Sequence, residues 1–345
     1  GMVDLAKPPQ SQKKKLWRYL PVLAVFGLAV YFLAPQFATL IRSWDVVRNM
    51  TLWAVLLVVI CEIISWVGNG IVLSAILDIQ QQKLPVWKGT LIAVATLSIT
   101  LAAGGGVALA ATYSWIHREN QDGKTAVLAG VFPSFVNNGV LVAVSMIGVA
   151  YLLFVRLLTR LQLVEFSLIL LILGTFTAAA LLLLRSVDTV TRIVDWALGH
   201  WARLWHKPYD AERTRTMVAE FVEVWHSLGN GRWLKPLIGA LVNVGFDMLA
   251  LYFMFVASGT FISIGTLFAG YGLPLILGKM AFFFPGGVGV VEGSMVALFR
   301  GLHIPQSVGA VVVLGYRLFS IWLPTILGFL AAMYLSGKLF IRKEK

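Results

Sequence analysis

The chain has few charged residues for its size. Only 13% of its 345 residues are charged, against roughly 25% in soluble domains, while 59% are hydrophobic. A soluble chain of this length has too little interior to bury so much apolar surface. The composition therefore excludes a soluble enzyme or a nucleic-acid module as the main body. It predicts an all-α integral membrane protein, since helices satisfy their own backbone polar groups in lipid.

Cysteine and histidine are also scarce. The single cysteine, Cys61, excludes an intramolecular disulfide, and the spacing of the five histidines matches no zinc site. No GxGxxG, GxxxxGK[ST] or GxSxG pattern lies in a strand-to-helix context. No predicted cytoplasmic stretch is long enough for a catalytic domain. We therefore expect no enzymatic activity, no cofactor and no bound metal.

Long apolar runs dominate what is present, and six have about the 20-residue length of a spanning helix. They cover residues 17–36, 50–77, 125–155, 163–184, 235–257 and 306–336. Two further runs, 88–116 and 264–302, are interrupted. The interruptions are Gly104, Gly105 and Gly106 in the first run, and Pro285, Gly286, Gly287 and Gly289 in the second.

Glycine and proline disfavour a continuous helix. Broken backbone at membrane depth is tolerated only where it is buried in protein or lines a polar cavity. The two interrupted runs are therefore predicted to be re-entrant hairpins, with two kinked spanning helices as the alternative.

The positions of the 28 lysines and arginines favour the hairpins. If the N-terminus is inside and each hairpin returns to its own side, 21 cations lie inside and five outside. The remaining two, Lys279 and Arg317, lie within the membrane. Because cytoplasmic loops are enriched in Lys and Arg, we expect a multi-pass cell-membrane protein with both termini cytoplasmic. The net charge of +12 then reflects topology and does not indicate a nucleic-acid partner.

This topology contains an inverted repeat. Residues 50–155 form a first unit of span, hairpin and span, and residues 235–337 form a second. Gly105 and Gly287 lie 182 residues apart at equivalent positions, and the two hairpins enter from opposite sides. Paired interrupted segments of this kind indicate a substrate site between the units. The other segments are 1–49 (basic tail, first span and outer loop), 156–185 (connecting span), 186–234 and the basic tail 338–345.

The segment 186–234 is amphipathic. Its valines, leucines and tryptophans recur at three- and four-residue steps, opposite cationic faces. Two interpretations stay open. The two helices lie flat on the cytoplasmic membrane surface, as tryptophans and basic faces favour, or they form a small helical hairpin packed against the core.

Ionisable residues inside predicted membrane segments are costly and indicate function by default. They are Glu62, Asp247, Lys279, Glu292 and Arg317, with Asn243 one turn before Asp247. One interpretation is a salt-bridge network that holds the helices together, and the other is a polar binding cavity at mid-depth. Both can hold at once. Asn137 and Asn138 are predicted to bond across helices.

The second glycine break has a chemistry of its own. A half-helix that begins just after Gly287 directs unpaired amides toward the bilayer centre, where they favour an anion such as phosphate. The same geometry is expected after Gly105. Glu292 would repel an anion unless it pairs with Arg317 or Lys279, and its alternative role is to carry a coupling proton. The sequence leaves this choice open.

Three stretches resemble one known family. The run PGGVGVVEG (285–293) resembles a motif of the lysylphosphatidylglycerol synthase transmembrane-region family, also called flippase-like domain proteins. GYRLFSIWLPTILGFLA (315–331) resembles its last span. AAGGGVALA (102–110) resembles its first glycine-rich segment, with Ala103 where many members have proline. The motif residues carried over are Pro285, Gly286, Gly287, Gly289, Glu292, Tyr316 and Arg317.

The resemblance implies a domain related to the part of the lysyl-lipid synthases that moves lipid between leaflets. We expect no aminoacyl-transfer domain in this chain, and therefore transport without synthesis. The predicted function is a flippase-like transporter of an anionic lipid or lipid-linked headgroup, working by alternating access of two inverted repeats. The alternatives are a secondary transporter of a soluble anion and a non-transporting membrane scaffold.

The expected substrate site combines both glycine breaks with Glu292, Tyr316, Arg317 and Lys279. Glu62, Asp247 and Asn243 are expected to form a coupling or polar network. The expected partner is an anionic membrane lipid, and a membrane-protein partner or a homo-oligomer stays open.

Overall fold

The fold is described from a computed structural model. It describes residues 41–103, 108, 111–112, 114–116, 123–155, 159–229, 231–281 and 284–342, with positions 27, 31, 34 and 38. Each element assigned in these residues is helical. Most of the predicted first span (17–36) and the break at Gly104, Gly105 and Gly106 lie outside the described residues.

The elements of the described residues follow one another along the chain in a single order. They are α2 (Trp44–Arg48), α3 (Leu52–Ile79), α4 (Val86–Ala103), α6 (Gly123–Val155), α7 (Arg160–Leu183), α8 (Val187–Leu204), α9 (Ala211–Ser227), α10 (Leu234–Ala257), α11 (Ile264–Met280), the 3₁₀ turn η1 (Pro285–Gly287), α12 (Val290–Gly301), α13 (Gln306–Arg317), the π-helical turn η2 (Leu318–Trp322) and α14 (Leu323–Arg342).

Five helices of the described chain are long and apolar enough to cross a membrane. They are Leu52–Ile79, Val131–Val155, Arg160–Leu183, Leu234–Ala257 and Gln306–Ser336. Five of the six predicted spans are therefore confirmed, with ends that differ by a few residues. The multi-pass, all-helical prediction is correct for the part of the chain that the structure describes.

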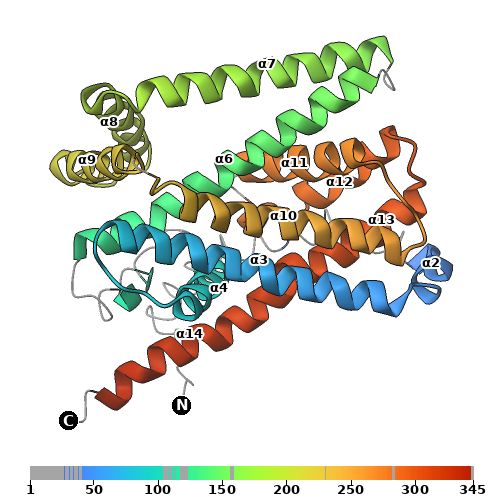
Figure 1. Cartoon of the computed structure of the whole chain (residues 1–345), viewed down its shortest axis with the longest axis horizontal. Helices are drawn as coiled ribbons and strands as arrows, with labels where there is room; N and C mark the ends of the chain where they lie inside the picture. Colours follow the sequence, from blue (N-terminus) through green and yellow to red (C-terminus); the bar gives the residue numbers. More distant parts are fainter. Residues whose placement is uncertain are drawn as a thin grey trace, which may run out of the picture.

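Helices α3 and α10 run antiparallel through the middle of the bundle (Figure 1). They cross closely at Gly68, where an added Cβ would lie 2.8 Å from the carbonyl oxygen of Gly239. The Ser65 hydroxyl donates a 2.7 Å hydrogen bond to the carbonyl oxygen of Asn243 at the same crossing. Small residues allow this approach because apolar lipid gives helices little hydrophobic reason to associate, so close packing must hold them together.

Each helical unit packs against the other in a reciprocal way. Helix α4 packs on α14, where the Ser98 hydroxyl donates to the carbonyl oxygen of Thr325 at 2.6 Å. Helix α11 packs on α6, where Gly272 lies directly against Ser145. The first helix of each interrupted segment thus contacts the last span of the other unit.

The second interrupted segment folds back on itself. Gly286 and Gly287 both have φ of +65°, a left-handed conformation that glycine adopts without steric cost. Helix α12 then returns along α11, with Val291 against Gly278 and the Phe299 ring against Gly270. In the first segment, the Thr96 and Thr112 hydroxyls lie 2.8 Å apart, so the residues after the undescribed break also lie beside α4.

The last span is interrupted just after Arg317. Five residues, Leu318–Trp322, form a π-helical turn before the α-helix resumes. Pro324 lies in the next turn and has no N–H to donate, which removes one helical hydrogen bond and favours such an irregularity. The turn follows directly on the most polar part of the span.

Helices α8 and α9 pack on each other, and α9 packs on α6. The Phe135 ring on α6 meets Phe221 with 5.1 Å between centroids and Trp225 with 5.6 Å. Trp196 on α8 and Trp205, which follows its last residue, remain more than half exposed. The two helices therefore contact each other and the core and keep an exposed tryptophan edge, and their place at the cytoplasmic membrane surface stays a prediction.

Candidate functional site

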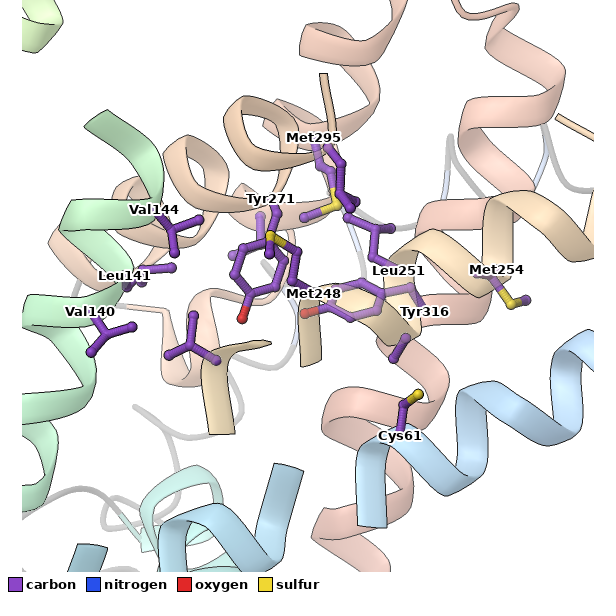
Figure 2. Close-up of a cluster of buried hydrophobic side chains, with 14 of the residues drawn as sticks. Cys61, Val140, Leu141, Val144, Met248, Leu251, Met254, Tyr271, Met295 and Tyr316 are labelled. Carbon is purple, nitrogen blue, oxygen red and sulfur yellow. The ribbon is translucent and has the colours of Figure 1, made fainter. Parts of the chain in front are cut away.

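The Asp247 carboxylate on α10 receives two tyrosine hydroxyls. Tyr271 on α11 donates a 2.8 Å hydrogen bond to its Oδ2, and Tyr316 on α13 donates one of 2.7 Å to the same atom. Both rings are almost fully buried in the main hydrophobic cluster, and Figure 2 shows their hydroxyls turned toward the same space. A buried hydroxyl needs a hydrogen-bond partner, and here both hydroxyls use the same carboxylate. Asp247 therefore links α10 with α11 and α13.

Glu62 on α3 completes this group from the other side. Its side chain is 1% exposed, and it lies one turn before Ser65, whose hydroxyl bonds to Asn243 one turn before Asp247. Its Oε1 atom has no hydrogen-bond partner among the described residues. An acid in such a position differs from the salt-bridged acids that usually occur in protein interiors.

Glu292 and Arg317 form a separate pair that holds the second break. The Arg317 Nε donates a 2.7 Å hydrogen bond to Glu292 Oε1, and one terminal nitrogen donates to the Gly286 carbonyl oxygen at 2.8 Å. The other Glu292 oxygen accepts the backbone N–H of Gly289 at 2.5 Å. The first turn of α12 therefore already has a carboxylate as its anion, supplied by the protein itself.

A cavity of about 400 Å³ opens between these helices. Its polar lining comes from Asn69, Thr100, Asn137, Asn138, Asn243, Asp247, Tyr271, Lys279, Tyr316, Arg317 and Ser320. Gly286 and Gly287 also border it, so the backbone of the break forms part of the wall. The Oδ1 atoms of both Asn137 and Asn138 and the Ser320 hydroxyl are buried without a partner among the described residues. Such groups accommodate water or a polar ligand.

Lys279 differs from the other cation of the cavity. It lines the cavity near the end of α11, its side chain is exposed, and it forms no salt bridge among the described residues. The charge of Arg317, in contrast, is balanced by Glu292 at 2.7 Å. The ammonium of Lys279 is therefore the cation that an incoming anion would meet.

The structure brings most of the sequence-predicted residues together. Asn243, Asp247, Lys279, Gly286, Gly287, Tyr316 and Arg317 border the cavity. Glu62, Gly289 and Glu292 lie behind its wall, where Glu292 accepts hydrogen bonds from the Gly289 N–H and from Arg317. The side chain of Pro285 and the glycines at 104–106 lie outside the described residues. The cavity and the buried ion pair are both present, while binding in the cavity stays a prediction.

Several lining residues were missed as site residues. Asn137 does bond across helices, donating 2.6 Å to Asn69 Oδ1, yet both asparagines also line the cavity. Tyr271 lies in a short apolar helix between two glycines. The available signal was the same as for Glu62, since a polar atom inside a membrane segment needs a polar partner.

Comparisons with known proteins agree with this architecture. Residues 20–328 match the family described as the lysylphosphatidylglycerol synthase TM region. A UPF0104 membrane protein of Methanocaldococcus jannaschii is 28% identical over 162 residues, which are 46% of this chain and 47% of the relative. One of Pyrococcus horikoshii is 25% identical over 217 residues, 57% of this chain and 62% of the relative.

A third UPF0104 membrane protein, from Methanothermobacter thermautotrophicus, is 26% identical over 157 residues, 44% of this chain and 45% of the relative. The matched stretch thus spans about half the length of the first of these relatives. The family match, over residues 20–328, is far longer than any of these three alignments. It includes the residues of the broken segment and those that line the polar cavity. The chain belongs to the lysylphosphatidylglycerol synthase transmembrane-region family of integral membrane proteins.

Proposed function

We propose that this protein moves an anionic lipid between the two membrane leaflets, with the headgroup passing through the polar cavity and the acyl chains staying in the bilayer. The observation that carries the proposal is the cavity itself. A polar space inside a bundle of spanning helices is costly unless water or a polar solute occupies it. Its volume of about 400 Å³ is in the range of small-ligand sites and suits a headgroup better than a whole lipid.

The charges of the cavity support an anionic group. Lys279 offers an ammonium without a salt-bridge partner among the described residues. Arg317 contributes less net charge, because Glu292 neutralises it, and we assign it the role of holding the glycine break in place. Asn69, Asn137 and Asn138 surround the same space with amides that can donate to phosphate oxygens.

The reciprocal packing supports alternating access by two inverted repeats. The Ser98–Thr325 contact in one half corresponds to the Gly272–Ser145 contact in the other. Ser145 and Thr325 lie 180 positions apart, and Ser98 and Gly272 lie 174 apart, close to the sequence-derived 182. Under this proposal α11 and α12 form a re-entrant hairpin, and rocking of the two units opens the cavity to each leaflet in turn.

The orientation follows from the cations. Figure 1 places α8, α9, the start of α10 and the C-terminal end of α14 at one end of the bundle. Eight Lys and Arg residues lie between 185 and 235, in the segment that includes α8 and α9. We therefore propose that this end faces the cytoplasm, in a cell membrane.

The test is lipid movement in vesicles that contain the purified protein. Fluorescent phosphatidylglycerol in the inner leaflet is protected from an impermeant quencher until it is moved outward. We expect wild-type protein to speed its movement and Lys279→Gln to reduce that rate at least about tenfold, as removal of a charged contact of roughly 1.4 kcal/mol or more would do. Arg300→Gln is the matched control, because this exposed cation ends α12 away from the cavity.

The alternatives have distinct outcomes in the same vesicles. Uptake of inorganic phosphate without lipid movement would overturn the proposal in favour of a soluble-anion transporter. Wild-type vesicles that equal protein-free vesicles in both assays would favour a non-transporting scaffold.

A further inference from the structure

Glu62 and Asp247 lie at the close crossing of α3 and α10. Glu62 lies on α3 and Asp247 on α10, and Ser65 and Asn243 lock the same two helices together one turn away. Glu62 lies one turn before Ser65 and Asp247 one turn after Asn243, so the antiparallel helices set the two carboxyl groups side by side. Asp247 borders the cavity, while Glu62 lies behind it at 1% exposure. Asp247 thus separates Glu62 from the cavity.

Two adjacent buried carboxylates repel each other, and a hydrogen bond between them would require a proton. An ionised carboxylate only accepts, so two carboxylates have no hydrogen to share. Asp247 already accepts hydroxyls from Tyr271 and Tyr316 on one oxygen. Glu62 has no such donor, since its Oε1 is unpartnered within the described chain. The proton therefore resides on Glu62.

The charges that face the pair lead to the same assignment. On α3 the neighbour is Cys61, and from α13 the field of Arg317 reaches Glu62. Arg317, however, is hydrogen-bonded to Glu292 of α12. Lys279 of α11 acts on Asp247. Among the described residues no cation forms a salt bridge with Glu62, and a buried carboxylate without a compensating cation is strongly disfavoured.

We propose that Glu62 and Asp247 are a proton-binding site of this cavity, in which Glu62 holds the proton and Asp247 passes it to and from cavity water. The balance is simple. A proton leaves hydronium for the Asp247 carboxylate and moves to Glu62, while Asp247 returns to its charged form between the two tyrosine hydroxyls. Tyr271 and Tyr316 are positioning residues in this step.

The site joins the two helical units, because Glu62 belongs to residues 50–155 and Asp247 to residues 235–337. Separation of the units would part Glu62 from Asp247 and expose Glu62 to cavity water. This step rests on the proposed lipid movement: one proton crosses the membrane for each lipid that is moved, so the proton is the coupling ion.

The proton itself is tested without transport, by infrared spectroscopy of the purified protein in lipid nanodiscs. Wild type should show the carbonyl band of a protonated carboxyl at neutral pH, shifted in heavy water and lost in Glu62→Gln. Asp247→Asn should also lose it, because an amide at 247 can donate to an ionised Glu62. Glu165→Gln, an exposed acid on α7, should keep the band. A wild-type band that persists in Glu62→Gln, or no band at all, overturns the site.

Coupling is tested in the vesicles with a pH difference of one unit across the membrane. One proton per lipid should bias the steady-state distribution of labelled phosphatidylglycerol about tenfold between leaflets. Glu62→Gln, which preserves shape and should elute as the wild type does, is expected to abolish the bias. If the protein moves lipid but shows neither a pH-driven bias between leaflets nor the infrared carboxyl band, only the proton site is overturned. A Glu62-dependent band in a protein that moves no lipid overturns the proposed function alone.

Discussion

The guanidinium of Arg317 lies 2.7 Å from the carboxylate of Glu292, and both side chains are at most 3% exposed. The same two side chains also bond to backbone on either side of the glycine break, at Gly286 and Gly289. The pair therefore fixes an irregular loop in which the 3₁₀ bond from the Gly287 N–H to the Phe284 carbonyl oxygen replaces the regular helical pattern. Arg317 in this arrangement is first a structural residue, although it also borders the cavity.

Removal of one member of this pair should destabilise the protein strongly. Arg317→Met leaves Glu292 buried and unpaired, which should cost about 3–5 kcal/mol. The double variant Arg317→Met with Glu292→Met should recover most of the loss, because no uncompensated charge remains. Thermal unfolding in detergent, followed by tryptophan fluorescence, measures both, with exposed Arg300→Met as control. A single variant that unfolds at the wild-type temperature contradicts the structural role.

The α3–α10 crossing should not tolerate a side chain at Gly68. A Cβ there would press on the backbone of α10, 2.8 Å from the Gly239 carbonyl oxygen, and force the helices apart. Gly68→Ala should therefore cost about 1–3 kcal/mol in thermal unfolding. Gly245→Ala on α10 is the control, because nothing lies within 4 Å of its added Cβ, and it should be neutral or stabilising by up to about 1 kcal/mol. Equal effects of the two changes would show that the crossing is looser than described.

The cavity should be wet. Cys61, which is 5% exposed, is first replaced in a Cys61→Ala background. In this background the thiol of a Ser320→Cys variant should react with a small charged reagent from water, because Ser320 lines the cavity. Val312→Cys, at a position with 0% exposure, should react far more slowly in the same background, because thiolate formation needs water. Mass spectrometry of the labelled protein reports both rates. Equal, slow labelling at the two positions would mean that the cavity is closed to water.

The α8–α9 hairpin should be held to the core by its aromatic contacts with α6. Phe221 meets Phe132 at 5.0 Å and Phe135 at 5.1 Å between ring centroids. Phe221→Ala should weaken the attachment by roughly 2 kcal/mol, less than for a fully buried phenylalanine because Phe221 is only partly buried. Limited trypsin cleavage after Arg213 or Arg215 should then be faster. The control is Trp196→Ala, at a position that is 66% exposed, and trypsin should cleave this variant at the wild-type rate. If its cleavage rate rises as much as that of Phe221→Ala, the effect comes from disruption of the surface and not from the contacts with α6.

Much of the fold could be predicted because its causes are local. Apolar runs long enough to cross a bilayer locate their own helices, so the predicted 235–257 and observed Leu234–Ala257 differ by one residue at one end. The break at 285–289 was predictable because glycine and proline act on their own backbone. The five intramembrane ionisable residues were also recognisable one by one, since each is costly in hydrocarbon wherever it lies.

The pairing of those residues could not be predicted. The sequence left Glu292 open to Arg317, Lys279 or a proton, and the structure assigns it to Arg317. It grouped Glu62 and Asp247 as a polar network but did not show that Tyr271 and Tyr316 donate to Asp247. Asn69 and Tyr271 escaped notice because their role depends on the helices that face them.

The amino-acid sequence by itself determined that this is a multi-pass helical membrane protein with a broken segment near residue 287, because composition and backbone chemistry act over one or two turns. Only the tertiary structure decided which charges neutralise each other and which face a cavity. Those outcomes depend on contacts between residues far apart in the chain, such as Ser65 with Asn243 at a separation of 178 positions. A close helix crossing brings such residues together, and no local pattern specifies its register.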